Sequence, residues 1–285
     1  MMKNQSWNVL IFTALLVSFS YVGFASDISV KLAPEEIFPG DAFLVEVKSD
    51  SAPSGSLDGM PLQFYPVSSG LYRAVFSTDV ETNPGEYIIR LIVDEKPIEL
   101  AFLVHEKRFS VTKLSLRSDK VFISPEDQAR VEEEDKKLSA LWSNITEPMW
   151  EGKFVPPLNT SISSPFGVIR ILNQKVDSRH KGVDYRSPAG KPVKAINSGL
   201  VVLAEELFYG GNTVMVNHGG GIFSIYMHLS EFKVKVGETV SKNDVVGLIG
   251  ATGRATGPHL HLSLKIAGRS ANPESLFALP LDGPK

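Results

Sequence analysis

Short runs of alternating apolar and polar residues fill the first third of the chain after its N-terminus. Phe43–Val47 and Tyr87–Val93 are two such runs, and turn sequences such as Asn83-Pro84-Gly85 separate them. Alternation with a period of two is typical of strands that bury one face. We therefore expect residues 26–105 to form an immunoglobulin-like β-sandwich. It contains no polar constellation suited to chemistry, so a binding or spacing module is the preferred interpretation.

A helical pattern follows within residues 106–150. Ser124 offers a hydroxyl N-cap, Pro125 suits the first helical position, and two acidic residues face the positive end of the helix dipole. The apolar residues then recur at helical spacing, at Val131, Leu138, Leu141 and Trp142. We expect this region to be a linker that contains a helix.

Residues 151–285 return to strands punctuated by glycine, with no segment that reads as a long helix. The expected strands include Leu200–Ala204, Thr213–Asn217, Ile222–His228, Val245–Ile249 and His259–Ile266. Many tight turns between short strands favour an antiparallel β domain. The predicted fold class is therefore mostly β: a sandwich, a helical linker and a C-terminal antiparallel domain.

The first 25 residues resemble an export signal. Lys3 precedes an apolar run from Val9 to Phe24, and Gly23 and Ala25 fit a cleavage site. An uncleaved membrane anchor is the alternative, because the run is long for a signal core. We expect cleavage, an exported protein of the periplasm or cell envelope, and no stable membrane insertion afterwards.

Composition narrows the possible chemistry. The net charge of −3 provides no basic excess for a phosphate backbone, which argues against nucleic-acid binding. The absence of cysteine excludes disulfides, thiolate ligands and a cysteine nucleophile. Any metal site must therefore use His, Asp or Glu.

Five of the six histidines lie in the second β region. His180 and Asp184 share a face in extended chain, and Gly182 between them leaves room, so both could converge on one metal ion. A surface hydrogen bond between them is the competing interpretation. His259 and His261 also share one strand face, with Leu260 on the other; two solvated histidines are the alternative there.

On strand 222–229, strict alternation places His228 on the same face as Ser224 and Tyr226. A lone histidine in such a strand is more often structural than functional. His218 sits at a hairpin turn and is interpreted as structural. Arg170 and Tyr226 are weaker candidates for holding a substrate.

Together these motifs resemble one family, the lysostaphin-like (LytM-type) zinc metallo-endopeptidases, which hydrolyse peptidoglycan. The resemblance covers about residues 150–276 and rests on motifs in the family's order: Ser164-Pro165-Phe166-Gly167, His180-x-Gly-x-Asp184, Tyr226-x-His228-Leu229 and Gly253-x-x-x-Gly257-Pro258-His259-Leu260-His261. It implies Zn²⁺ held by His180, Asp184 and His261, with His228 and His259 as catalytic histidines.

The resemblance also implies a zinc-dependent endopeptidase that cuts peptide cross-links of bacterial peptidoglycan. The alternative is an inactive wall-binding relative that activates a separate amidase, which the presence of all five site residues disfavours. One departure is Leu262-Ser263, where many relatives have an aromatic residue and a glutamate; it puts in doubt a contact behind the metal ligands. The sequence does not indicate an oligomeric state.

Overall fold

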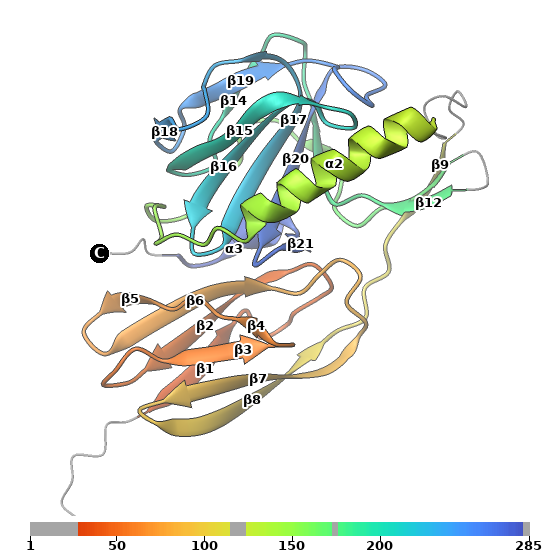
Figure 1. The fold of residues 1–285 in the computed structure, drawn as a ribbon. Helices are drawn as coiled ribbons and strands as arrows, with labels where there is room; N and C mark the ends of the chain where they lie inside the picture. The colour runs from red at the N-terminus through yellow and green to blue at the C-terminus, as the bar shows by residue number, and fades with distance from the viewer. Residues whose placement is uncertain (1–27, 115–123, 173–175, 282–285) are drawn as a thin grey trace, which may run out of the picture.

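The structure is a computed structural model of the chain and describes residues 28–114, 124–172 and 176–281. The predicted export signal, residues 1–25, lies outside the described residues. The described chain consists mostly of antiparallel strands, with one long helix, α2, lying across a sheet (Figure 1). This confirms the predicted mostly-β fold class.

Two four-stranded antiparallel sheets form the N-terminal part. The first has the order β1-β2-β6-β5 and the second the order β4-β3-β7-β8. In chain order the strands are β1 (Ser29–Ala33), β2 (Ala42–Lys48), β3 (Ser54–Leu57), β4 (Met60–Pro61), β5 (Tyr65–Ser68), β6 (Leu71–Ser77), β7 (Gly85–Val93) and β8 (Lys96–Val104). Both sheets contribute to one buried core, with Phe43 and Phe76 from one side and Ile89 and Phe102 from the other. The alternating runs therefore form a sandwich; its likeness to immunoglobulin domains stays a prediction.

The segment between the two β regions is attached to the second one. Strand β9 (Val111–Leu114) runs parallel to β11 (Ile169–Leu172), which pairs in turn with β12 (Val176–Arg179). Helix α2 (Pro125–Trp142) begins where predicted, because the Ser124 side chain accepts a hydrogen bond from the Asp127 amide. The predicted linker is thus a strand and a helix that both contact the C-terminal part.

A ten-stranded antiparallel sheet organises the C-terminal part, with β10-β13-β20-β17-β16-β15-β18 as its main path. Its strands are β10 (Ile162–Ser164), β13 (Gly182–Arg186), β14 (Pro192–Lys194), β15 (Gly199–Leu207), β16 (Gly211–Gly219), β17 (Ile222–Phe232), β18 (Thr239–Val240), β19 (Val245–Ile249), β20 (His259–Ile266) and β21 (Arg269–Ala271). The short helix α3 (Pro273–Ala278) follows. Neither described helix is long and apolar enough to cross a membrane.

Strand β20 presents different side chains on its two faces. Leu260, Leu262 and Leu264 are fully buried in the core of the sheet. Ser263 and Lys265, at intervening positions, face helix α2, which lies across this sheet (Figure 1), and alternation places His259 and His261 on the same face. Helix α2 packs there through Leu138, Leu141 and Trp142, next to a small cluster that includes Phe223.

The sandwich and the C-terminal sheet share a buried core. Tyr65 of the sandwich meets Trp150 edge-on with ring centroids 5.2 Å apart, and Phe154 lies 5.9 Å beyond. Across the same boundary, the Ala42 amide donates to Ser275 Oγ at 2.8 Å and the Ser270 amide donates to Asp79 Oδ2 at 2.8 Å. The two halves therefore pack on each other through apolar side chains and hydrogen bonds.

Candidate metal and catalytic site

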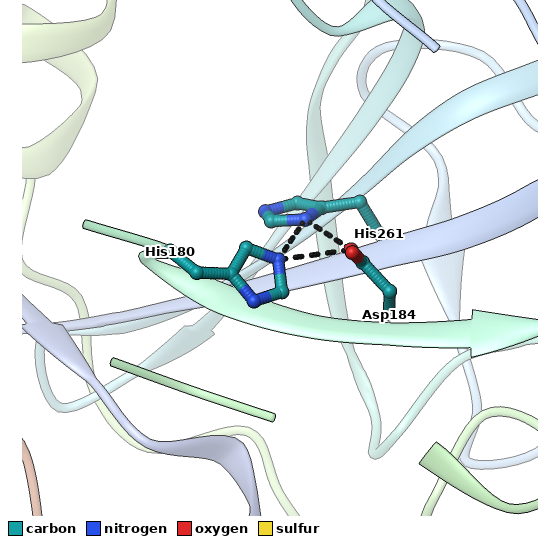
Figure 2. Close-up of side chains that lie close together, drawn as sticks. All are labelled: His180, Asp184 and His261. Carbon is teal, nitrogen blue, oxygen red and sulfur yellow. Dashed lines mark hydrogen bonds and ion pairs between the residues drawn. The ribbon is translucent and has the colours of Figure 1, made fainter. Parts of the chain in front are cut away.

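His180, Asp184 and His261 converge at one point on the sheet (Figure 2). Asp184 on β13 is the cross-strand partner of His261 on β20, and His180 lies just before β13. Asp184 Oδ1 is 2.9 Å from His180 Nε2 and 2.8 Å from His261 Nδ1. Gly182 makes this approach possible, because a Cβ there would stand 2.6 Å from His261 Nε2. The predicted i, i+4 pair and the cross-strand pairing found in the structure thus bring three side chains together.

Backbone and hydroxyl groups fix how the two imidazoles are turned. His180 Nδ1 donates to the Pro165 carbonyl at 2.8 Å, which leaves Nε2 without its hydrogen. His261 Nε2 donates to Ser263 Oγ at 2.7 Å, and that hydroxyl donates to the Lys181 carbonyl at 3.0 Å. The lone pairs of His180 Nε2 and His261 Nδ1 are therefore directed at Asp184.

Arg170 holds the second oxygen of the Asp184 carboxylate. Its Nη2 donates to Asp184 Oδ2 at 2.8 Å and to Ser164 Oγ at 3.2 Å. Burial raises the pKa of Asp184, but hydrogen bonds and charge from the protonated forms of His180 and His261 outweigh it, so without a metal ion the pKa is lowered overall. Asp184 is thus an anion whose Oδ1 stays directed at the two imidazoles.

These three side chains fit a divalent metal ion. The ligand atoms all lie within 4.8 Å of one another, and His180 and Asp184 are only 2% and 8% exposed. Burial lowers the pKa of His261, which favours the neutral ring that metal binding requires. Two imidazoles and a carboxylate suit metals that take mixed nitrogen and oxygen ligands.

His228 and His259 lie beside this cluster. Their ring centroids are 4.7 Å apart, the His228 ring is 6.1 Å from that of His261, and His259 Nε2 is 3.9 Å from Asp184 Oδ1. His228 Nδ1 donates to the Thr252 carbonyl at 2.9 Å, and His259 Nδ1 donates to the Gly257 carbonyl at 2.8 Å. In both rings Nε2 remains free of protein hydrogen bonds among the described residues.

The position of His228 differs from the one that alternation predicts. Met227 is the strand partner of His261, so a regular strand would turn His228 to the opposite face with Tyr226. Instead, His228 has φ +63°, a left-handed conformation that side chains rarely adopt, and strand pairing shifts register nearby. The expectation that His228 shares a face with Tyr226 is wrong, because this local irregularity turns the ring into the site.

The protein environment keeps the His228 ring neutral. Burial, followed by repulsion from His261 and His259 when those rings are protonated, lowers its pKa to about 4. A neutral imidazole with one anchored nitrogen can accept a proton at the other.

Comparison with known proteins identifies this region. The sequence profile of peptidase family M23 matches residues 178–273, which contain all five side chains. Residues 178–273 form a peptidase family M23 domain. The recognised family resemblance is thereby confirmed.

Relatives of the M23 domain come from several bacteria. The chain is 41% identical over 125 residues to the DD-carboxypeptidase/endopeptidase Mpg of Neisseria meningitidis, an alignment that covers 44% of this chain and 29% of that protein. It is 44% identical over 93 residues to the peptidoglycan DD-endopeptidase ShyA of Vibrio cholerae, covering 33% of this chain and 22% of that protein. The matches thus span less than a third of the length of these relatives.

A solved structure resembles more of the chain. A crystal structure described as a peptidase M23 from Pseudomonas aeruginosa aligns with this chain with a TM-score of 0.70 and 28% sequence identity. The alignment covers 85% of this chain and 95% of the Pseudomonas chain. The similarity therefore extends beyond the M23 domain to much of the N-terminal region.

Two side chains that support the site were not assigned their roles from sequence. Ser263 contacts His261 from behind, so a hydroxyl supplies the contact that the departure from the glutamate pattern had put in doubt. Arg170, considered as a substrate-binding residue, instead pairs with Asp184. Ser263 follows His261 by two residues on the same strand, a spacing that could have indicated its contact, whereas the Arg170–Asp184 pair depends on how separate strands are placed.

Tyr226 and His218 belong to the core of the M23 domain and not to its site. Tyr226 is fully buried, and its hydroxyl accepts from the Ile196 amide at 2.9 Å and lies 3.0 Å from Ser224 Oγ. His218 Nε2 lies 2.8 Å from the same Ser224 oxygen, and its Nδ1 donates to the Ser198 carbonyl at 2.8 Å. These contacts support the structural interpretation of His218.

Proposed function

We propose that the chain is a zinc-dependent endopeptidase that hydrolyses peptide cross-links of bacterial peptidoglycan. The observation that carries the proposal is the convergence of His180, Asp184 and His261, with the rings of His228 and His259 directly beside them. The M23 match and the names of the curated relatives support this substrate class.

We assign Zn²⁺ to the cluster, with His180 Nε2, Asp184 Oδ1 and His261 Nδ1 as its ligand atoms. Two imidazoles and one carboxylate form a ligand set that catalytic zinc sites use, and three protein ligands leave a position for water or substrate. When bound, zinc polarises a scissile carbonyl and lowers the pKa of a water molecule.

His228 and His259 are the proposed catalytic histidines. Their Nδ1 atoms are anchored to carbonyl groups, so each ring is held with Nε2 directed at the site. One ring accepts the proton of the attacking water, and the other stabilises the developing oxyanion and donates a proton to the leaving amine. The low pKa of His228 keeps that ring available as an acceptor above about pH 4.

The division of the chain follows from this assignment. We propose an export signal in residues 1–25, a sandwich domain in 26–105, a linker in 106–150 and the peptidase domain in 151–285. Peptidoglycan lies outside the cytoplasm, so action in the periplasm or cell envelope is consistent with this substrate. An inactive amidase-activating role is less well supported, because its defining feature would be loss of one or more of the five site residues.

Zinc content and cleavage of purified sacculi test the proposal together. We expect His261→Ala and Asp184→Ala to lose zinc and activity, because each removes a ligand. We expect His228→Ala and His259→Ala to retain zinc while activity falls by about 100-fold or more, as for loss of a general acid or base.

His105→Ala is the matched control, since His105 packs beside Phe38 in the N-terminal part and should leave both measurements unchanged. Full zinc retention in both ligand variants would show that the metal assignment is wrong. A zinc-loaded native protein that leaves sacculi and cross-linked peptides intact would refute the activity.

A further inference from the structure

A cleft of about 540 Å³ lies between helix α2 and the face of the C-terminal sheet. Leu138 and Trp142 of α2 line one side, and Ile225 and Met227 of β17 line the other. Pockets of this size with apolar walls and a few polar groups are typical of sites for small ligands. The α2 wall lies outside the residues that match family M23, so this cleft is a feature of the longer chain.

One end of the cleft adjoins the candidate metal site. Ser263, which hydrogen bonds to His261, lines the cleft, as do Lys181 and Met227, the neighbours of His180 and His228 in sequence. A substrate that extends from the metal cluster along β20 therefore enters the space beneath α2.

Lys265 lines the cleft farther along the same strand face. Successive residues on one face of a strand are about 7 Å apart, so its Cα lies roughly 13 Å beyond that of His261. Its Nζ donates to Ser270 Oγ at 3.0 Å and to the Gly268 carbonyl at 3.3 Å, and stands 5.9 Å from the centre of the Trp142 ring. An ammonium has three N–H groups, so one remains without a hydrogen-bond acceptor among the described residues.

The charge of Lys265 has no ion-pair partner in the described part of the chain. Burial lowers its pKa, Asp79 raises it through charge, and Lys181 lowers it. The Asp79 carboxylate is already engaged by the Ser270 and Glu81 amides. The cleft therefore combines apolar walls with the incompletely satisfied cation of Lys265, and Glu134, Asp135 and Lys181 also line it.

We propose that this cleft is a substrate subsite in which Lys265 binds a free carboxylate of the peptide being cut. The ligand class is a short peptide with small aliphatic side chains and a carboxylate within about four residues of the scissile bond, since an extended chain advances about 3.3 Å per residue. The small side chains contact the apolar walls, and the carboxylate accepts from the third N–H of Lys265. This inference rests on the proposed endopeptidase function and adds a specificity determinant to it.

Two cross-linked peptides that differ only in a C-terminal carboxylate or carboxamide test this subsite. With zinc-loaded full-length protein, we expect kcat/KM to favour the carboxylate peptide by about tenfold or more, mainly through KM. Lys265→Met and Lys265→Gln should abolish the preference by slowing the carboxylate peptide alone. Lys194→Met, which removes an exposed lysine on β14, is the matched control and should retain it.

A preference that survives in both Lys265 variants would overturn the proposal, as would an equal loss for both peptides. Binding of the same two peptides to the zinc-loaded His259→Ala protein, measured by calorimetry, gives a readout that needs no cleavage. There, Lys265→Met should weaken the carboxylate peptide about tenfold, and Leu138→Trp, which fills the cleft, should weaken both peptides. If the native protein cleaves neither peptide, the proposed activity fails, while equal binding of acid and amide would refute the subsite.

Discussion

Ser263 positions His261 through a single hydroxyl group. It accepts from His261 Nε2 and donates to the Lys181 carbonyl, so it fixes both the tautomer and the orientation of the ring. We predict that Ser263→Ala lowers zinc affinity by about 10- to 100-fold, the range typical of such supporting contacts. Competition with a chelator measures this change.

Ser263→Thr keeps the hydroxyl and should retain most of the affinity. Ser230→Ala is a control on β17, because the Ser230 hydroxyl bonds to the Ile249 carbonyl away from the cluster. Unchanged zinc affinity in Ser263→Ala would contradict a positioning role for this residue.

His218 makes stability depend on pH. Burial lowers its pKa from 6.5 to about 4. Four hydrogen bonds connect the Ile196 amide to the Ser198 carbonyl by way of the Tyr226 hydroxyl, the Ser224 hydroxyl and the His218 ring. With a neutral His218 ring, the amide, the two hydroxyls and Nδ1 supply the four hydrogens that these bonds need. A protonated ring would bring a fifth hydrogen with no acceptor in this chain of bonds.

Between pH 6.5 and pH 4 the unfolded chain therefore binds one proton more at this residue than the folded protein does. The free energy of unfolding falls as pH is lowered through this window, by about 3 kcal/mol from His218. His218→Asn removes the titration, so its stability should decline less steeply from pH 6.5 to pH 4. Denaturant unfolding at several pH values tests this, and parallel pH profiles would contradict it.

At the scale of elements, helix α2 is held to the sheet by half-buried apolar side chains together with polar contacts. Val131 is its one buried residue among those described, whereas the Glu134 carboxylate accepts from the Phe208 amide at 2.9 Å and pairs with Arg130 at 2.8 Å. Helices with so little buried apolar surface depend on tertiary contacts for their stability. Opening of α2 is therefore expected to need less free energy than global unfolding.

We predict that Glu134→Ala lowers the free energy of opening α2 by about 1.5–3 kcal/mol, the range for a hydrogen bond to a charged group. Amide exchange across residues 125–142 should speed up accordingly. Glu132→Ala is the matched control, because Glu132 bonds only to Gln128 on the same helix among the described residues. Equal exchange in the two variants would show that Glu134 does not hold the helix in place.

For the whole molecule, the shared core couples the sandwich to the peptidase domain. Trp150 is 1% exposed and lies between Tyr65 of the sandwich and Phe154. We predict that Trp150→Ala lowers the free energy of unfolding by about 3–5 kcal/mol, as for other large-to-small changes in cores. Denaturant unfolding of the native protein should show a single transition, whereas two well-separated transitions would show that the halves fold independently.

Much of the architecture follows from local patterns in the chain. Period-two alternation predicted the strands of both β regions, since a strand with one buried face must alternate. The Ser124-Pro125 sequence fixed the start of α2, because capping depends on neighbouring residues alone. Spacing also indicated that His180 and Asp184 could converge and that His259 and His261 share one face, because these relations lie within single extended segments.

Tertiary structure decided the features that depend on residues distant in sequence. The turn of His228 into the site requires a register shift and φ +63°, which alternation cannot anticipate. The contact of Arg170 with Asp184 joins separate strands, and the hydrogen bond from Ser263 to the Lys181 carbonyl joins segments far apart in the sequence. Helix α2 shows an apolar stripe in the sequence, but only packing reveals that it lies on the catalytic face and encloses Lys265. Local periodicity determines which face of an element is buried, whereas its partner is chosen by the packing of the whole chain.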